Sequence, residues 1–180
     1  MRRNVLKMNE EKKYGVRRDG SYYTRVDFAT VTENDPTFWV NNIIDDDLER
    51  CGGTWGANSE TTADAVLSFF GESQTVSKIK IYKNVGLDIS ILEELAKVVN
   101  IYVSDTDAPR SLKRKGDDIN SVAWQKVASI NVIKEEGWQE VVLPDPVNAK
   151  YVRIELVDNF CKRDETFIPW IEISEVKIYG

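Results

Sequence analysis

Short segments in which hydrophobic and polar residues alternate recur from residue 26 to the C-terminus. Alternation with a period of two is typical of β-strands that bury one face and leave the other in water. The clearest example spans 76–82, where we expect Val76, Ile79 and Ile81 in the core. Eight segments of this kind predict strands at 26–31, 65–70, 76–82, 98–103, 124–132, 138–143, 151–157 and 171–179. Clusters of Gly, Asn, Asp and Pro separate them, which favours an antiparallel sandwich.

Three stretches depart from this pattern. The segment SILEELA at 90–96 begins with a capping box and continues with helical spacing, so it predicts a short helix between two strands. Residues 104–121 are rich in charge and predict a long surface loop. Residues 1–25 are polar and aperiodic, and we interpret them as an N-terminal tail or linker before a single domain at 26–180.

Composition limits the classes of partner. The chain has 180 residues, of which 42% are hydrophobic and 30% charged, as expected of one globular domain. Its 24 basic and 30 acidic residues give a net charge of −6, which disfavours binding to a nucleic acid backbone. No apolar run is long enough for a transmembrane segment, and the basic start of the chain is not followed by the apolar stretch of a signal peptide.

The absence of histidine limits the possible chemistry. It excludes Ser-His-Asp and Cys-His catalysis and zinc sites that use His ligands. Two cysteines cannot form a structural zinc site, and the sequence has no Gly-rich phosphate-binding loop or nucleophile elbow. A carboxylate pair can hydrolyse glycosides without His, but among thirty acidic residues a suitably spaced pair carries no information. We therefore expect no enzymatic activity.

Four stretches resemble, in order, the coagulation factor 5/8 type C, or discoidin-like, domain. They are NIIDDDLER at 42–50, AVLSFFGESQTVSKIKIY at 65–82, VNIYVSD at 99–105 with WQKV at 124–127, and AKYVRIEL at 149–156 with the terminal ISEVKIYG. The first is similar to the family's acidic turn and the second to its strand–Gly–strand hairpin. The resemblance covers residues 26–180. It implies an all-β, galactose-binding-like jelly roll of about eight strands, with the short helix as an insertion.

The resemblance also implies a structural calcium ion beneath the acidic turn at 45–47. Carried over by position, the ligands are Asp45, Asp47, the backbone carbonyls near Ile43 and Arg50, and Ser174 with Glu175. Two positions differ from the family, because Asp46 stands where a Gly is usual and Arg50 where a Thr is usual. From the residues alone, a solvated acidic loop remains the alternative.

Two loops combine aromatic residues with small and polar ones. They are CGGTWGANSE at 51–60 and DNFCKRDETFIPW at 158–170, and the resemblance places them side by side at one end of the sandwich. A sugar needs a flat apolar ring and planar polar groups, and these loops contain both. The expected ligand residues are Trp55, Asn58, Phe160, Arg163 and Trp170. Alternatively, Trp55 and Trp170 close the open end of the barrel; we expect Trp39 to serve in packing.

The only cysteines, Cys51 and Cys161, lie one in each of these loops. The family arrangement allows a disulfide bond between them, which would join the two loops. The alternative is two free thiols in a cytosolic protein.

The leading functional hypothesis is a noncatalytic carbohydrate-binding accessory module that is secreted or displayed on a cell surface. The partner is then a glycan or polysaccharide, and the chain is a monomer or part of a multidomain protein. An alternative is a cytoplasmic protein–protein interaction domain in which the same loops grip a protein. A phospholipid-binding variant ranks third, because anionic headgroups attract basic rather than acidic proteins.

Overall fold

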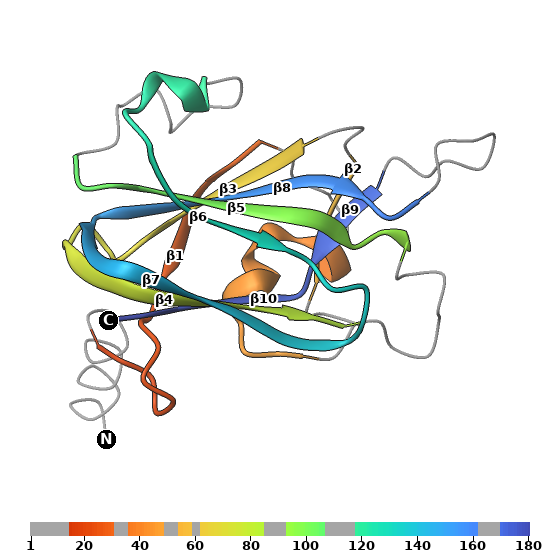
Figure 1. The fold of residues 1–180 in the computed structure, drawn as a ribbon, viewed down its shortest axis with the longest axis horizontal. Coiled ribbons are helices and arrows are strands. Elements are labelled where there is room, and N and C mark those ends of the chain that lie inside the picture. The colour runs from red at the N-terminus through yellow and green to blue at the C-terminus, as the bar shows by residue number, and fades with distance from the viewer. Residues whose placement is uncertain are drawn as a thin grey trace.

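The computed structural model describes residues 15–30, 36–48, 54–58, 62–84, 93–106, 118–161 and 170–180. Within these ranges the chain is mostly β-strand, arranged as a sandwich of antiparallel sheets (Figure 1). Its helices are single 3-10 turns: η1 (Pro36–Phe38), η2 (Val40–Ile44) and η5 (Ile119–Ser121). No helix in the described ranges is long and apolar enough to cross a membrane.

One layer of the sandwich is a five-stranded antiparallel sheet. Its strand order is β1-β3-β8-β5-β6, so that strands distant in sequence become neighbours. The strands are β1 (Arg25–Ala29), β3 (Thr62–Ser68), β8 (Tyr151–Asn159), β5 (Ala96–Ser104) and β6 (Gln125–Asn131). This sheet contains five of the strands that alternation predicts.

The opposite layer is a three-stranded antiparallel sheet with a smaller ladder beside it. The order in the three-stranded sheet is β10-β4-β7, formed by β10 (Glu175–Tyr179), β4 (Gln74–Lys83) and β7 (Gly137–Ala149). The two-stranded ladder pairs β2 (Trp55–Asn58) with β9 (Trp170–Ile173). The second layer is thus formed by the three-stranded sheet and the β2–β9 ladder.

The core lies between the layers and is built from the inward faces of the strands. Val76, Ile79 and Ile81 are fully buried, which confirms their predicted place. Strict alternation would put Val76 on the face opposite to the other two, but the register of β4 against β7 shifts between Val76 and Lys78. This β-bulge adds a residue and returns Val76 to the core.

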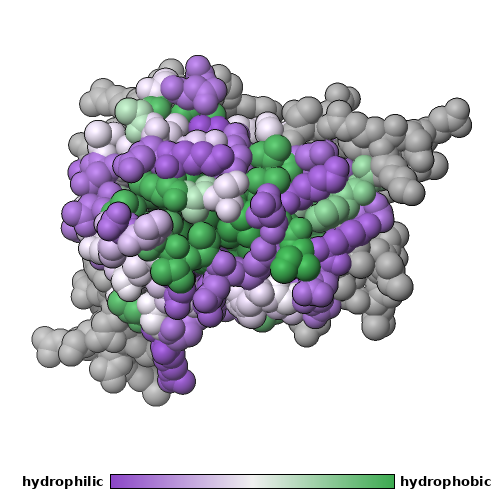
Figure 2. All heavy atoms as spheres, in the orientation of Figure 1, coloured by the Kyte–Doolittle hydropathy of each residue, from purple (hydrophilic) through white to green (hydrophobic). Residues whose placement is uncertain are grey.

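The strands β6 and β7 form the edges of the two layers on the same side of the sandwich. Figure 2 shows hydrophobic side chains in the middle of the face on which these strands lie, framed by hydrophilic ones. Val142 on β7 and Ile133, in the turn between the two strands, are among the exposed large hydrophobic residues. Half-buried Val127 of β6 and Val141 of β7 pack against the core along this edge.

Three elements differ from the predictions. Strand β2 is not predicted, because the four-residue segment WGAN is too short to show alternation. It becomes a strand only by pairing with β9. The predicted strand at 171–179 is two strands that separate at Ser174. The predicted helix at 90–96 ends earlier than expected, since Glu93 is in a 3-10 turn but Leu95 bridges to Glu172 and Ala96 begins β5. The start of that helix, at 90–92, lies outside the described residues.

The described part of the N-terminal segment packs against the sandwich. Ser21 bridges to Tyr179 of β10, and the backbone N–H of Tyr22 donates to the carbonyl of Ile178. The Tyr22 ring meets Phe69 edge to face at 5.3 Å between centroids. From residue 15 onward this segment is therefore part of the folded domain, a difference from the tail or linker drawn at 1–25; residues 1–14 lie outside the description.

A second, smaller cluster covers the outer face of the five-stranded sheet. Its buried members are Val66, Ile119 and Val122, with Trp124 packed against them. The indole N–H of Trp124 donates to the Ile119 carbonyl at 2.8 Å. The C-terminal end of the loop predicted at 104–121 thus contains η5, which lies against the sheet.

Candidate functional site

The β2–β9 ladder brings two predicted ligand residues together at one end of the sandwich. Asn58 and Trp170 lie directly opposite each other in this ladder, which is at the right in Figure 1. The side-chain amide of Asn159, the last residue of β8, donates to the Trp170 carbonyl at 2.6 Å. Strands β2 and β8 therefore end close together, and residues 59–61 and 162–169, which belong to the loops after them, lie outside the described residues.

Trp170 is held in place by its neighbours. Its ring lies so close to Gly56 that a side chain at position 56 would overlap it. Phe38 meets the ring edge to face at 5.0 Å between centroids, and the indole N–H donates to Glu172 Oε2 at 3.4 Å. Trp170 is half-buried, so it is neither a plug fully inside the barrel nor a free platform.

Trp39 is the aromatic residue that the sequence analysis assigned to packing and that the structure instead exposes. Its exposed fraction is 47%, and it follows Phe38, the residue that packs against Trp170. The segment is fixed by Asn42, whose side-chain amide donates to the carbonyls of Pro36, Thr37 and Thr54. A Trp between two 3-10 turns gives no periodic signal of its exposure, which is why the sequence alone did not identify it.

Phe160 lies in a braced turn after β8. Asp158 has φ 55 and its carboxylate pairs with Lys97 at 2.9 Å, while the backbone N–H of Cys161 donates to Asn159 Oδ1 at 3.1 Å. The Phe160 ring is half-buried against the core, and the Lys134 ammonium lies 5.7 Å from its centroid. Arg163, the other residue predicted from this loop, lies outside the described residues.

The structure corrects the prediction that Trp55 lies on the ligand face. The sequence analysis placed it among the ligand residues, but its exposed fraction is 0% and it belongs to the main core cluster. It begins β2 opposite Ile173, at the end of the ladder away from Asn58 and Trp170. Among the described residues, its indole N–H has no hydrogen-bond partner. Trp55 therefore belongs to the packed interior and cannot contact a ligand.

The predicted disulfide stays a prediction. Cys161 is half-buried at the start of its loop, and Cys51 lies outside the described residues.

The acidic turn predicted to hold calcium begins where η2 ends. Asp46 takes a left-handed backbone with φ 66, and the backbone N–H of Asp47 donates to Asp45 Oδ1 at 2.8 Å. Glu175 opens β10 beneath the turn and accepts a 3.3 Å hydrogen bond from the Asp46 backbone N–H. Its exposed fraction is 0%. Burial raises the pKa of Glu175 to about 8, although the positive charge of Arg17 acts in the opposite direction.

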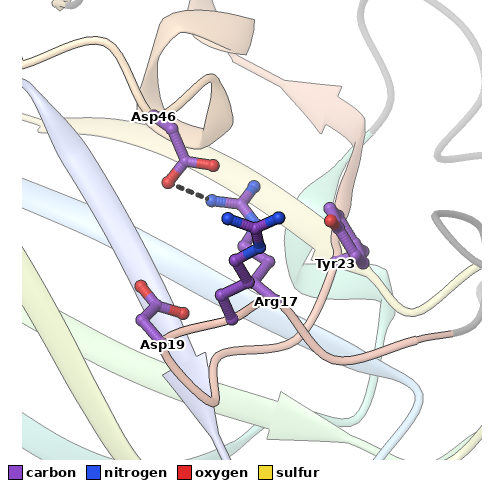
Figure 3. A pocket seen from close by; sticks show the side chains of 5 residues that line it. Arg17, Asp19, Tyr23 and Asp46 are labelled. Carbon is purple, nitrogen blue, oxygen red and sulfur yellow. Dashed lines mark ion pairs between the residues drawn. The ribbon is translucent and has the colours of Figure 1, made fainter.

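Two cationic side chains lie at this turn. Arg17 Nη2 donates to the Ile44 carbonyl at 2.7 Å, and Arg17 Nη1 is 2.7 Å from Asp46 Oδ1 and 3.5 Å from Glu175 Oε1. Lys177 Nζ lies 2.8 Å from the same Asp46 oxygen. Figure 3 shows Arg17 between Asp46 and Tyr23. These residues line a pocket with a volume of about 320 Å³.

These contacts do not fit the calcium site that the resemblance implies. Calcium takes six to eight oxygen ligands at about 2.3–2.6 Å, whereas Glu175, one of the implied ligands, faces the Arg17 guanidinium, and the neighbouring Ile44 carbonyl and Asp46 carboxylate also face nitrogen cations. Ser174 accepts a hydrogen bond from the Asn84 backbone N–H at 2.9 Å, and Arg50 is not among the described residues. Within the described ranges no group of three or more acidic, Cys or His side chains is arranged to hold a metal ion.

Solved structures share this fold. No protein-family model and no curated protein matches the chain. The module CpGH89CBM32-5 from Clostridium perfringens, in complex with GalNAc-β-1,3-galactose, has a TM-score of 0.63 and 10% identity, over 87% of this chain and 95% of that one. The family 32 carbohydrate-binding module of C. perfringens NanJ, in complex with galactose, has a TM-score of 0.62 and 13% identity, over 87% and 93%.

A third structure extends the likeness to another organism. The family 32 carbohydrate-binding module of Streptococcus pneumoniae EndoD has a TM-score of 0.63 and 12% identity, over 87% of this chain and 95% of that one. The chain therefore has the jelly-roll fold of these modules, which confirms the fold class predicted from the sequence.

Proposed function

We propose that this chain is a noncatalytic carbohydrate-binding module that binds its glycan at the β2–β9 end of the sandwich. The observation that carries the proposal is the gathering of an exposed Trp39, the Phe38–Trp170 pair and Asn58 at that end. Three of the solved structures with this fold are carbohydrate-binding modules, which supports the same reading.

Recognition of a sugar follows from the chemistry of these side chains. The C–H face of a pyranose ring packs against an aromatic ring, and the Asn58 amide offers both a donor and an acceptor to hydroxyl groups. The Asn42 hydrogen bonds and the Asn159 bond to Trp170 hold the backbone in place before the ligand arrives. A prearranged site loses less conformational entropy on binding.

The proposal extends to where the module acts. The module contributes no catalytic step, since the sequence has no histidine and no nucleophile–base motif. We place the module outside the cell or on its surface, where it attaches to a polysaccharide. A cytoplasmic protein-interaction domain remains the alternative.

Replacing Trp39 with alanine should weaken glycan binding by about tenfold or more, because stacking on an exposed ring is lost. A glycan array that includes galactose- and GalNAc-terminated sugars identifies the ligand, and calorimetry then compares the variants. Trp138→Ala is the matched control, since Trp138 is 41% exposed on the outer face of the three-stranded sheet. An array without any bound glycan, or an equal loss in both variants, would contradict the proposal.

Gly56→Ala should weaken the same binding while leaving the fold intact. The added methyl group overlaps the Trp170 ring, which must turn away from β2 and from Phe38. Gly71→Ala is the control, because no atom lies near the Cβ position there, although its φ of +93° adds some strain. Near-ultraviolet circular dichroism would report the moved indole. Full affinity in Gly56→Ala would show that the position of Trp170 is irrelevant to the ligand.

A further inference from the structure

The acidic turn combines exposed carboxylates with one buried carboxyl group. Glu175 is fully buried and Asp46 lies directly above it, close enough for the Asp46 backbone to donate to the Glu175 carboxylate. A buried carboxylate without a compensating positive charge is strongly unfavourable. In the structure two cationic side chains, Arg17 and Lys177, lie at this turn, and of the two Arg17 is the one that also faces Glu175.

The N-terminal segment delivers such a cation from outside the predicted domain. Residues 16–22 form a small hairpin, in which Val16 bridges to Tyr22 and the Arg17 N–H donates to the Ser21 carbonyl at 2.7 Å. Gly20 has φ +86, which permits the tight turn. Tyr22 anchors the hairpin through its hydroxyl, which donates to the Thr75 carbonyl at 2.9 Å.

The guanidinium of Arg17 reaches one implied calcium ligand, Glu175, and two oxygens next to the other implied ligands. One nitrogen bonds the Ile44 carbonyl, and another lies between the Asp46 and Glu175 carboxylates. The Arg17 side chain is 10% exposed, and its guanidinium lies 5.3 Å from the centroid of the Tyr23 ring. Within the described residues, neither Arg17 Nη1 nor Glu175 Oε1 has a hydrogen-bond partner, so charge is what relates the two atoms.

We propose that the Arg17 guanidinium is the built-in cation of this turn and takes the place that a calcium ion would otherwise fill. The module then folds without a divalent cation, and loss of Arg17 opens the turn to one. This inference is independent of the proposed glycan site, because it concerns the ion balance of a different turn.

The first experiment uses the native chain. Its melting temperature should be the same in EDTA and in about 10 mM calcium chloride, a concentration above the dissociation constants of weak extracellular calcium sites. A calcium-dependent rise of about 3 °C or more would show a metal site in the native protein and overturn the proposal. This measurement requires no variant to fold.

The second experiment removes the positive charge of Arg17. Arg17→Gln should lower the melting temperature by about 6–15 °C, as expected when one partner of a buried ion pair is lost. Calcium should restore part of this loss in Arg17→Gln and leave the native protein unchanged. Arg18→Gln is the matched control, because Arg18 is the exposed neighbour in the same hairpin.

A double-mutant cycle with Glu175→Gln tests whether the two charges act on each other. The double variant Arg17→Gln/Glu175→Gln should lose less stability than the sum of the single losses, because each single variant leaves the other side chain buried without its partner. Equal losses in Arg17→Gln and Arg18→Gln, or additive losses in the cycle, would overturn the proposal. A variant that stays insensitive to calcium would also overturn it, since Arg17 would then be an ordinary ion pair.

Discussion

Trp55→Ala is expected to cost about 3–5 kcal/mol of folding free energy, which is the usual range for removing a buried Trp. The side chain is fully buried in the main core cluster, where it begins β2 opposite Ile173. The truncation leaves a cavity that rigid strands cannot close. Urea denaturation measures the loss directly. The melting temperature should fall by about 6–20 °C.

Two comparisons separate this role from ligand binding. Trp39→Ala should change stability little, since Trp39 is 47% exposed. Trp55→Phe should cost less than Trp55→Ala, because the ring fills most of the space and the unpartnered indole N–H is removed. If Trp55→Ala kept the native melting temperature and lost glycan affinity, the residue would belong to the ligand face after all.

Arg153→Met is the second large effect that we expect, at about 3–5 kcal/mol. Arg153 Nε donates to Asp64 Oδ1 at 2.7 Å, and both side chains are buried on the outer face of the five-stranded sheet. Arg153 Nη2 lies 3.3 Å from Glu155 Oε1. Without the guanidinium, Asp64 becomes a buried charge with no compensating partner at this contact.

The loss in Arg153→Met should depend on pH. Burial raises the pKa of Asp64, although its hydrogen bond to Arg153 lowers it. Removing Arg153 raises this pKa further, so the folded variant takes up a proton at a higher pH than the unfolded chain does. Its deficit should therefore be largest at about pH 8 and shrink as the pH falls toward about 3, below the ordinary pKa of Asp, where the carboxyl is neutral in both states.

A matched variant controls for lost packing. Arg153→Met/Asp64→Asn removes both charges, and it should be more stable than Arg153→Met at about pH 8 and show a weaker pH dependence. Urea denaturation at both pH values measures this. A deficit in Arg153→Met that is equal at both pH values would mean that packing, and not the ion pair, accounts for the loss.

The alternation of residues was sufficient to predict most strands and much of the core. Within 76–82, side chains that point alternately inward and outward follow from backbone geometry alone, so Ile79 and Ile81 could be assigned to one buried face without a partner strand. The bulge that brings Val76 onto the same face was not visible, because it depends on pairing with β7. Local geometry thus predicts a strand, and its register needs the neighbour.

Composition contributed an expectation about the class of function. The absence of histidine and of nucleophile motifs favours binding over catalysis whatever the fold. The jelly roll was predicted from the resemblance of four stretches, in order, to a known family, whereas alternation alone predicted only an antiparallel sandwich. The pairing of Asn58 with Trp170 was not predicted, because it depends on strand β2, which alternation does not show.

Only the tertiary structure decided which aromatic residues face the solvent and which charges meet. Trp55 and Trp39 both lie in segments without periodicity, yet one is fully buried and the other 47% exposed, because exposure depends on which strands pack over a segment. The Arg17 contact with Glu175 joins the two ends of the described chain. Such a contact forms only when the hairpin at 16–22 docks on β10, and no local pattern records it.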